Sequence, residues 1–272
     1  MPATPPVASA LFLSHGGGPL PVLGDPGHEE MRTALRDIAN QCARPSAIVV
    51  VSAHWEEARP TLLSHPAPAL FYDYYGFPEE SYALRYPAPG APALSHPLLR
   101  QLRQHGFDAT ENNERGFDHG LFIPLLLMYP DADIPCTQLS LLGNLDADAH
   151  LRLGEALRGA LPPGTLLIGS GFSFHNMRAF FAPSTDETRR MNQGFEDWLE
   201  QTCTDTALNE EDRRQRLQDW AAAPFARYCH PREEHLLPLH VCYGFAGRAA
   251  NRHVGMSILG KQASAFLWLA EH

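Results

Sequence analysis

The chain has 272 residues, 44% of them hydrophobic and 19% charged, which fits one large globular domain with a sizeable core. Its formal net charge of −10 argues against a nucleic acid or an anionic membrane as partner, because both attract basic surfaces. No uninterrupted apolar stretch reaches about 18 residues, so we expect no transmembrane helix.

Two further features predict a cytoplasmic protein. The five cysteines are odd in number and form no C-x-x-C pair, which favours reduced thiols. The segment 1–6 lacks the basic residue and the apolar run of a signal peptide.

The hydrophobic pattern predicts strands that alternate with helices. In chain order we expect a strand at 8–14, a helix at 29–41, strands at 47–53 and 61–64, helices at 93–105 and 119–128, a strand at 134–141, a helix at 146–161, a strand at 165–174, and helices at 185–207 and 210–222. The alternation indicates a single α/β domain spanning residues 1–272, with a mixed central sheet flanked by helices.

Three segments need separate comment. The aromatic segment 71–78 is too rich in Gly and Pro to be regular. Pro231 is suited to the first turn of a helix that runs through His235 to about Tyr243. Residues 253–269 are expected to form one long strand or a bulged pair.

Four histidines lie where apolar runs break. His15 ends the first predicted strand and opens onto a glycine run, His54 and His175 end two later apolar runs, and His235 precedes an apolar segment. A lone histidine at a strand end is more often structural, but ligands bind at strand tips in open α/β sheets. Imidazoles that converge at such an edge suggest a metal.

A fifth histidine, His119, opens an apolar helix and would face the cleft if that helix packs there. Asp118, the residue before it, is a candidate to cap the N-terminus of that helix. Eight of the other histidines lie in polar stretches or in ambiguous positions. We expect six of them at the surface (His28, His65, His96, His105, His150 and His272) and leave His240 and His253 open.

Residue types leave the ligand set open. His15 and His54 with Glu233 or Glu234 would make the two-histidine, one-carboxylate triad of non-haem iron oxygenases. With His235 as third ligand the site has three histidines, a set that also suits zinc. The glutamates can equally face solvent, as we expect for Glu233.

Seven motifs together resemble those of the 4,5-DOPA extradiol dioxygenase family, a group of class III (LigB-type) ring-cleaving dioxygenases. They occur in family order from about residue 8 to the C-terminus: LSHGG (13–17), VVSAHW (50–55), YPAPG (86–90), GFDHG (116–120), YPDADIP (129–135), SGFSFHN (170–176) and EHLLPL (234–239). One departure is Gly17-Gly18, where many relatives have Gly-Ser-Pro after the first histidine.

The resemblance implies a phosphorylase/hydrolase-like α/β fold and a metal held by His15, His54 and His235. It implies Fe(II) in the active form, with Zn(II) an alternative in isolated protein. His175 matches a histidine that acts as acid/base or approaches as an extra ligand. His119 matches one that contacts the substrate.

The implied function is extradiol cleavage of a catechol, DOPA-like or a related phenolic, by O2. The aromatic loop, with Tyr74 and Tyr75, is expected to bind the substrate ring. Arg85, Arg178 and Arg227 are candidates to bind a substrate carboxylate. A zinc-dependent hydrolase on the same histidines and a non-catalytic metal-binding relative are the alternatives. The sequence does not specify the catechol, the bond cleaved or the oligomeric state.

Overall fold

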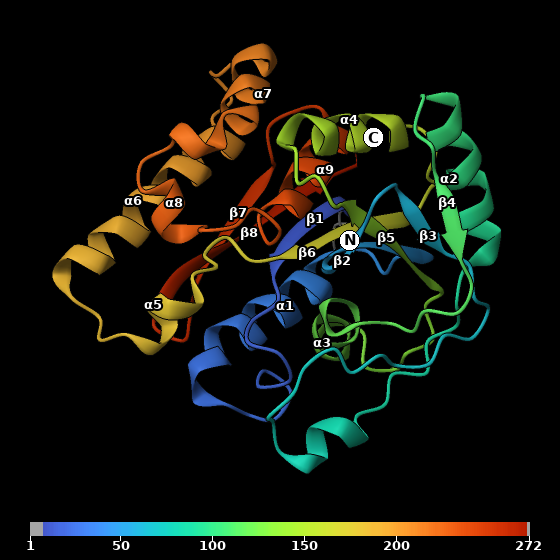
Figure 1. Ribbon diagram of the computed structural model, residues 1–272, viewed down its shortest axis with the longest axis horizontal. Coiled ribbons are helices and arrows are strands. Elements are labelled where there is room, and N and C mark those ends of the chain that lie inside the picture. Colours follow the sequence, from blue (N-terminus) through green and yellow to red (C-terminus); the bar gives the residue numbers. More distant parts are fainter. Residues whose placement is uncertain (1–7, 271–272) are drawn as a thin grey trace, which may run out of the picture.

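The computed structural model describes residues 8–270 and has one eight-stranded sheet at its centre (Figure 1). In spatial order the strands are β4 (Thr110–Asn112), β3 (Thr61–Leu63), β5 (Cys136–Leu142), β2 (Ala47–Glu57), β6 (Thr165–Gly171), β1 (Ala8–Ser14), β8 (Lys261–Leu269) and β7 (Arg252–Ile258).

The four central strands, β5, β2, β6 and β1, pair in parallel. The pairs β3–β5, β1–β8 and β7–β8 are antiparallel, so the sheet is mixed, as expected. Every residue of β5 and β6 is buried, which explains why their sequences, apart from Gln138, are apolar or small throughout instead of alternating with charged residues.

Helices cover both faces of the sheet (Figure 1). On one face lie α1 (Glu29–Gln41) and α3 (His119–Met128), and on the other lie α2 (Pro92–Gln104), α4 (Ala147–Leu157) and α9 (Leu237–Ala246). The helices α4 and α9 touch backbone to backbone. A Cβ atom added at Gly154 would lie 2.1 Å from the carbonyl oxygen of Val241, so this crossing requires glycine.

A second group of helices packs beside the edge formed by β8 and β7, at the left of Figure 1. It contains α5 (Met177–Phe181), α6 (Asp186–Thr204), α7 (Glu210–Gln218) and α8 (Ala226–Cys229). Short 3₁₀ turns occur at Pro26–His28, Glu79–Ala83 and Trp220–Ala222. Thr185 begins α6 with a capping box that it forms with Thr188.

Most of the predicted elements are confirmed to within a few residues, and Asp146 caps α4 as expected by accepting from the backbone N–H of Ala149. One expectation at the C-terminal end is wrong and another holds in part. The helix α9 begins at Leu237, because Pro238 and not Pro231 occupies its first turn. Residues 253–269 form a pair of strands, which was one of the two alternatives, but β7 pairs with β8 without a bulge. The pair is a hairpin, which turns at Leu259 and Gly260, both with positive φ.

Within residues 8–270, no helix has both the length and the apolar character needed to cross a membrane. All five cysteines are buried and free, as expected. The segment 1–6 and His272, for which we made predictions above, lie outside the described residues.

Candidate active site

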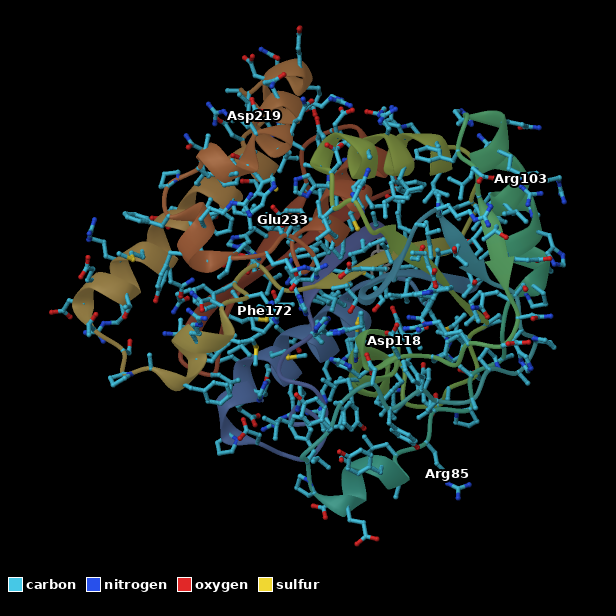
Figure 2. The ribbon with its side chains drawn as sticks, viewed as in Figure 1. Arg85, Arg103, Asp118, Phe172, Asp219 and Glu233 are labelled. Carbon is cyan, nitrogen blue, oxygen red and sulfur yellow. The ribbon has the colours of Figure 1, made fainter. Side chains whose placement is uncertain are left out.

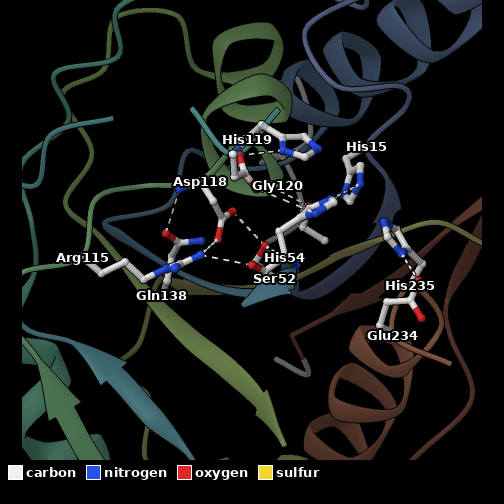
Figure 3. Close-up of polar contacts among 12 residues, drawn as sticks. His15, Ser52, His54, Arg115, Asp118, His119, Gly120, Gln138, Glu234 and His235 are labelled. Carbon is white, nitrogen blue, oxygen red and sulfur yellow. Dashed lines mark hydrogen bonds and ion pairs between the residues drawn. The ribbon is translucent and has the colours of Figure 1, made fainter. Parts of the chain in front are cut away.

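Five histidines from distant parts of the chain, His15, His54, His119, His175 and His235, meet at the carboxyl edge of the parallel strands. Figure 3 labels all of them except His175. His15 directly follows β1, and His175 follows β6. His54 lies within β2, where the pairing register with β5 shifts between Ser52 and Glu56. Such a bulge re-aims side chains, and here it turns His54 toward the other rings. His119 is the first residue of α3.

His235 reaches the same edge through a backbone contact with the end of β6. Its carbonyl oxygen accepts from the N–H of Phe172 at 2.9 Å. A Cβ atom at Gly171 would lie only 2.1 Å from that oxygen, so glycine is required at this position. The loop of His175 is fixed similarly, since its N–H donates to the carbonyl of Cys229 at 2.9 Å.

The five rings lie close to one another. The Nε2 atoms of His15 and His54 are 3.0 Å apart. The ring centroids of His15, His54 and His235 form a nearly equilateral triangle with sides of 4.8, 5.3 and 4.9 Å. His119 lies beside His54, at 3.8 Å between centroids, and His175 stacks on His235 at 3.4 Å.

Two groups have potential ligand atoms that all lie within 4.8 Å of one another. One is His15, His54 and His119, and the other is His175, Glu234 and His235. The structure therefore brings together all five histidines that the sequence singled out. It also places His119 close enough to His15 and His54 for the three to bind one metal ion.

Hydrogen bonds fix which nitrogen of His15 faces its neighbours. Ser170 Oγ lies 3.0 Å from His15 Nδ1 and donates its own proton to the carbonyl of Gly120. The hydroxyl oxygen must therefore accept from His15 Nδ1–H. That leaves the unprotonated Nε2 of His15 facing His54, with a lone pair available to a metal.

In three other rings, of His119, His235 and His175, a carboxylate oxygen lies beside Nδ1 and so leaves Nε2 as the nitrogen that faces away from it. Asp73 Oδ1 accepts from Nδ1 of His119 at 2.8 Å, and Glu234 Oε1 lies 3.0 and 3.2 Å from Nδ1 of His235 and His175. Burial acts to raise the pKa of both acids. The hydrogen bond and charge of His119 outweigh it at Asp73, and those of His175 outweigh it at Glu234, so both pKa values lie below their ordinary range. Carboxylates that orient histidines in this way are typical of metal sites.

The electrostatics of the cluster favour neutral rings. Burial first, and then the neighbouring histidines, hold the pKa of His15, His54 and His235 well below 6.5. Two nitrogen ligands about 2.1 Å from one ion and at right angles to each other lie about 3 Å apart, which is the separation of the Nε2 atoms of His15 and His54. The donor set thus fits a divalent ion that accepts imidazole, such as iron or zinc.

The side chain of Asp118 does not cap α3, contrary to the capping role considered for it. Its side chain is fully buried and accepts from Ser52 Oγ at 2.8 Å and from Arg115 at 3.1 Å (Figure 3). Asp73 takes the capping role, since its Oδ1 also accepts from the backbone N–H of His119 at 3.1 Å. Arg115 donates in addition to the carbonyl of His54 and so holds the β2 bulge in place.

The rings form one wall of a cavity of about 580 Å³. Its other lining residues are Gly16, Gly17, Gly18, Leu20, Tyr74, Phe77, Phe172, Met177, Phe180, Phe181 and Leu259. Tyr74 lines the cavity and donates its hydroxyl to the carbonyl of Ser81 at 2.6 Å. Tyr75, the other tyrosine expected to bind substrate, is 92% exposed and is not among the lining residues.

Two histidines expected at the surface are fully buried. His28 accepts from the N–H of Gly17 at 3.0 Å and pairs with Asp25, so it supports the glycine loop of the cavity. His150 joins the start of α4 to the end of β5.

The other histidines that the structure describes do not contribute to the cavity. His96 and His105 are exposed as expected, and His65 is half-buried. His240 and His253 form hydrogen bonds with Leu217 and Ser264. Glu233 pairs with Arg227 away from the cavity.

The fold and site together define a class: an α/β protein with a largely buried cluster of histidines, whose donor set fits a metal, beside a largely apolar cavity. Residues 9–267 match the family described as the catalytic LigB subunit of aromatic ring-opening dioxygenase. The chain belongs to this metal-dependent family, and the resemblance noted in the sequence is confirmed.

Individual relatives agree with this family. The chain is 39% identical over 254 residues to Dioxygenase tasH from Hapsidospora irregularis, covering 88% of this chain and 78% of that protein. It is 35% identical to 4,5-DOPA dioxygenase extradiol from Beta vulgaris, covering 89% and 88% of the two chains. A crystal structure of an uncharacterized protein from Escherichia coli K12 superimposes with a TM-score of 0.76 at 28% identity, covering 96% and 99%.

Proposed function

We propose that the whole chain is one catalytic domain, an extradiol dioxygenase that opens the ring of a catechol with O2. Fe(II) is the active metal in this proposal, and Zn(II) is the alternative in isolated protein. The observation that carries it is the set of five histidines, four of them with Nδ1 facing a hydroxyl or carboxylate oxygen, at the wall of a cavity large enough for an aromatic ring.

We assign the metal to His15, His54 and His235. The near-equilateral triangle of their centroids supports this set, because three rings of that spacing can direct one nitrogen each at a common point. His119 is the rival third ligand by distance. Its ring, however, packs against His54 at 3.8 Å, to one side of the triangle.

When bound, Fe(II) supplies a Lewis acid for the catechol oxygens and a redox partner for O2. His175 then acts as the acid/base. With Nδ1 directed at Glu234, its Nε2 is free to take a proton from a catechol hydroxyl and return it when the ring opens. His119, held by Asp73, presents Nε2 to a substrate oxygen. Tyr74 forms part of the wall against which the ring packs.

The test is oxygen uptake by the full chain, loaded anaerobically with Fe(II) and supplied with a panel of catechols. We expect one O2 consumed per catechol and a yellow ring-opened product. Hydrolysis of esters or amides by the zinc-loaded protein, without oxygen uptake by the iron form, would instead identify a zinc hydrolase, which the same histidines also suit. Metal binding with neither activity would identify a non-catalytic relative.

A further inference from the structure

Given the proposed function, we infer that the substrate is a catechol whose ring substituent is apolar and uncharged, and not one that carries a carboxylate. The inference concerns the specificity of the cavity described above and rests on that proposed function. The relatives named for DOPA act on an amino acid, so this chain would differ from them in substrate class.

The lining of the cavity carries no fixed charge. Within residues 8–270, no Lys, Arg, Asp or Glu lines it, and apart from the histidines its walls are apolar side chains, glycines and Tyr74. The Tyr74 hydroxyl is already used by the Ser81 carbonyl. A carboxylate on the ring substituent, beyond the reach of the metal that holds the two catechol oxygens, would lie against these walls without a cationic side chain beside it, which is unfavourable.

The arginines considered for a substrate carboxylate lie elsewhere. Arg85 and Arg178 are exposed, and Figure 2 shows Arg85 pointing away from the molecule. Arg227 pairs with Glu233 at 2.6 Å and stacks over Trp220. None of the three lines the cavity.

Arg232 also lies close to the histidines, and its charge is already neutralised by neighbouring carboxylates. It lines a smaller pocket of about 360 Å³ that shares His54 and His235 with the main cavity. Its guanidinium bonds both oxygens of Glu56, at 2.7 and 2.6 Å, and lies 3.3 Å from Glu234. A substrate carboxylate there would have to displace one of these acids.

Apolar side chains from separate elements surround the mouth of the main cavity. Phe181 and Met177 come from α5 and are 84% and 53% exposed, Leu259 comes from the β7–β8 turn, and Phe77 comes from the aromatic loop. Large exposed apolar side chains that cluster in this way mark binding surfaces. An apolar chain on the catechol ring would cover them.

The experiment compares catechols that differ in one feature at a time. We would measure kcat/KM from oxygen uptake by the iron-loaded full chain with 4-methyl-, 4-ethyl-, 4-propyl- and 4-butylcatechol, with 3-(3,4-dihydroxyphenyl)propanoate, and with its methyl ester. We expect kcat/KM to rise about fourfold per methylene, the equivalent of about 0.8 kcal/mol for each buried CH2. The ester, which lacks the charge of the acid and carries one extra methyl group, should exceed the acid by at least about tenfold. That is more than the gain of about fourfold expected from the methyl group, because the charge is desolvated without a partner.

Three variants sharpen the test. Phe181→Ala should reduce the gain per methylene, because the exposed wall is shortened. Met177→Arg places a cation at the mouth and should lower the ester-to-acid ratio. Arg178→Met, a neighbouring exposed position outside the cavity, should leave that ratio unchanged. If Arg178→Met lowered kcat/KM for the acid but not for the ester, Arg178 would be shown to bind the carboxylate, and the inference would be overturned.

The two levels of failure are distinguishable. If no catechol in the panel is consumed together with O2, the proposed function is wrong and the inference falls with it. If the acid or DOPA is turned over as well as the ester, or if the alkyl series is flat, the dioxygenase function stands and only the inference about substrate class is wrong.

Discussion

Asp73 binds His119 twice with a single carboxylate oxygen, through the backbone N–H at 3.1 Å and through Nδ1–H at 2.8 Å. The two residues are 46 positions apart, so this contact joins the aromatic loop to the start of α3. It sets the tautomer of His119 and the direction of its free nitrogen. Asp73 is therefore a positioning residue for the proposed substrate contact.

Asp73→Asn should reduce kcat about 10- to 100-fold, because removal of an orienting carboxylate typically costs that much. The amide can still accept from the backbone N–H, so the fold should be retained. Oxygen uptake measures the effect, with circular dichroism and iron content as controls. Restoration of most of the lost kcat by Asp73→Glu would support a positioning role, whereas unchanged kcat in Asp73→Asn would contradict it.

His175→Ala should leave the iron content intact and lower turnover by roughly 100-fold or more, the usual contribution of an acid/base group. His175 is partly exposed, at 20% of its side chain, so truncation should not unfold the protein. Iron content and single-turnover oxygen uptake are the two measurements. Normal turnover in this variant would remove the role we assign to His175.

Gly171→Ala should weaken iron binding more than tenfold. The new Cβ would lie 2.1 Å from the His235 carbonyl, so the segment that carries His235 must move. Gly143→Ala is the matched control, because there the nearest atom to the new Cβ is 3.4 Å away and its φ is not positive. Equal iron affinity in the two variants would mean that the position of His235 is unimportant for the metal.

Stability should fall in mild acid, in part through His150. Burial lowers its pKa from 6.5 to about 4, so between these values the unfolded chain binds a proton that the folded chain does not. The free energy of unfolding therefore decreases as the pH falls through this window, by about 2 kcal/mol from this residue between pH 7 and pH 5. Urea titrations at both pH values, on wild type and His150→Gln, should show a loss smaller by about that amount in the variant. Identical losses would exclude His150 as a source.

The sequence was sufficient for the elements that its hydrophobic pattern determines. The apolar runs that became β1, β2 and β6 are buried, and a histidine comes after each of them. His15 and His175 follow β1 and β6, whereas His54 lies inside β2, where the apolar run has ended but the strand continues to Glu57. The convergence of His15, His54 and His175 follows from parallel pairing, which aligns the carboxyl ends of strands.

The contacts that orient the histidines could not be predicted in this way. Asp73 lies in an irregular loop, and nothing local in its sequence distinguishes it from a solvated acid. His28 and His150 were expected at the surface because their neighbours are polar, yet each satisfies backbone groups inside the fold. Pairings across tens of residues depend on tertiary structure, and a single sequence carries no direct signal for them.

The central claim is that His15, His54 and His235 hold one metal ion. The most direct measurement is anomalous diffraction at the iron edge from crystals of the iron-loaded protein grown without oxygen. We expect one peak per chain within about 2.2 Å of a ring nitrogen of each of these three residues, a typical imidazole–metal distance. A peak bound to His119 in place of His235, or no peak near His15 and His54, would contradict the claim.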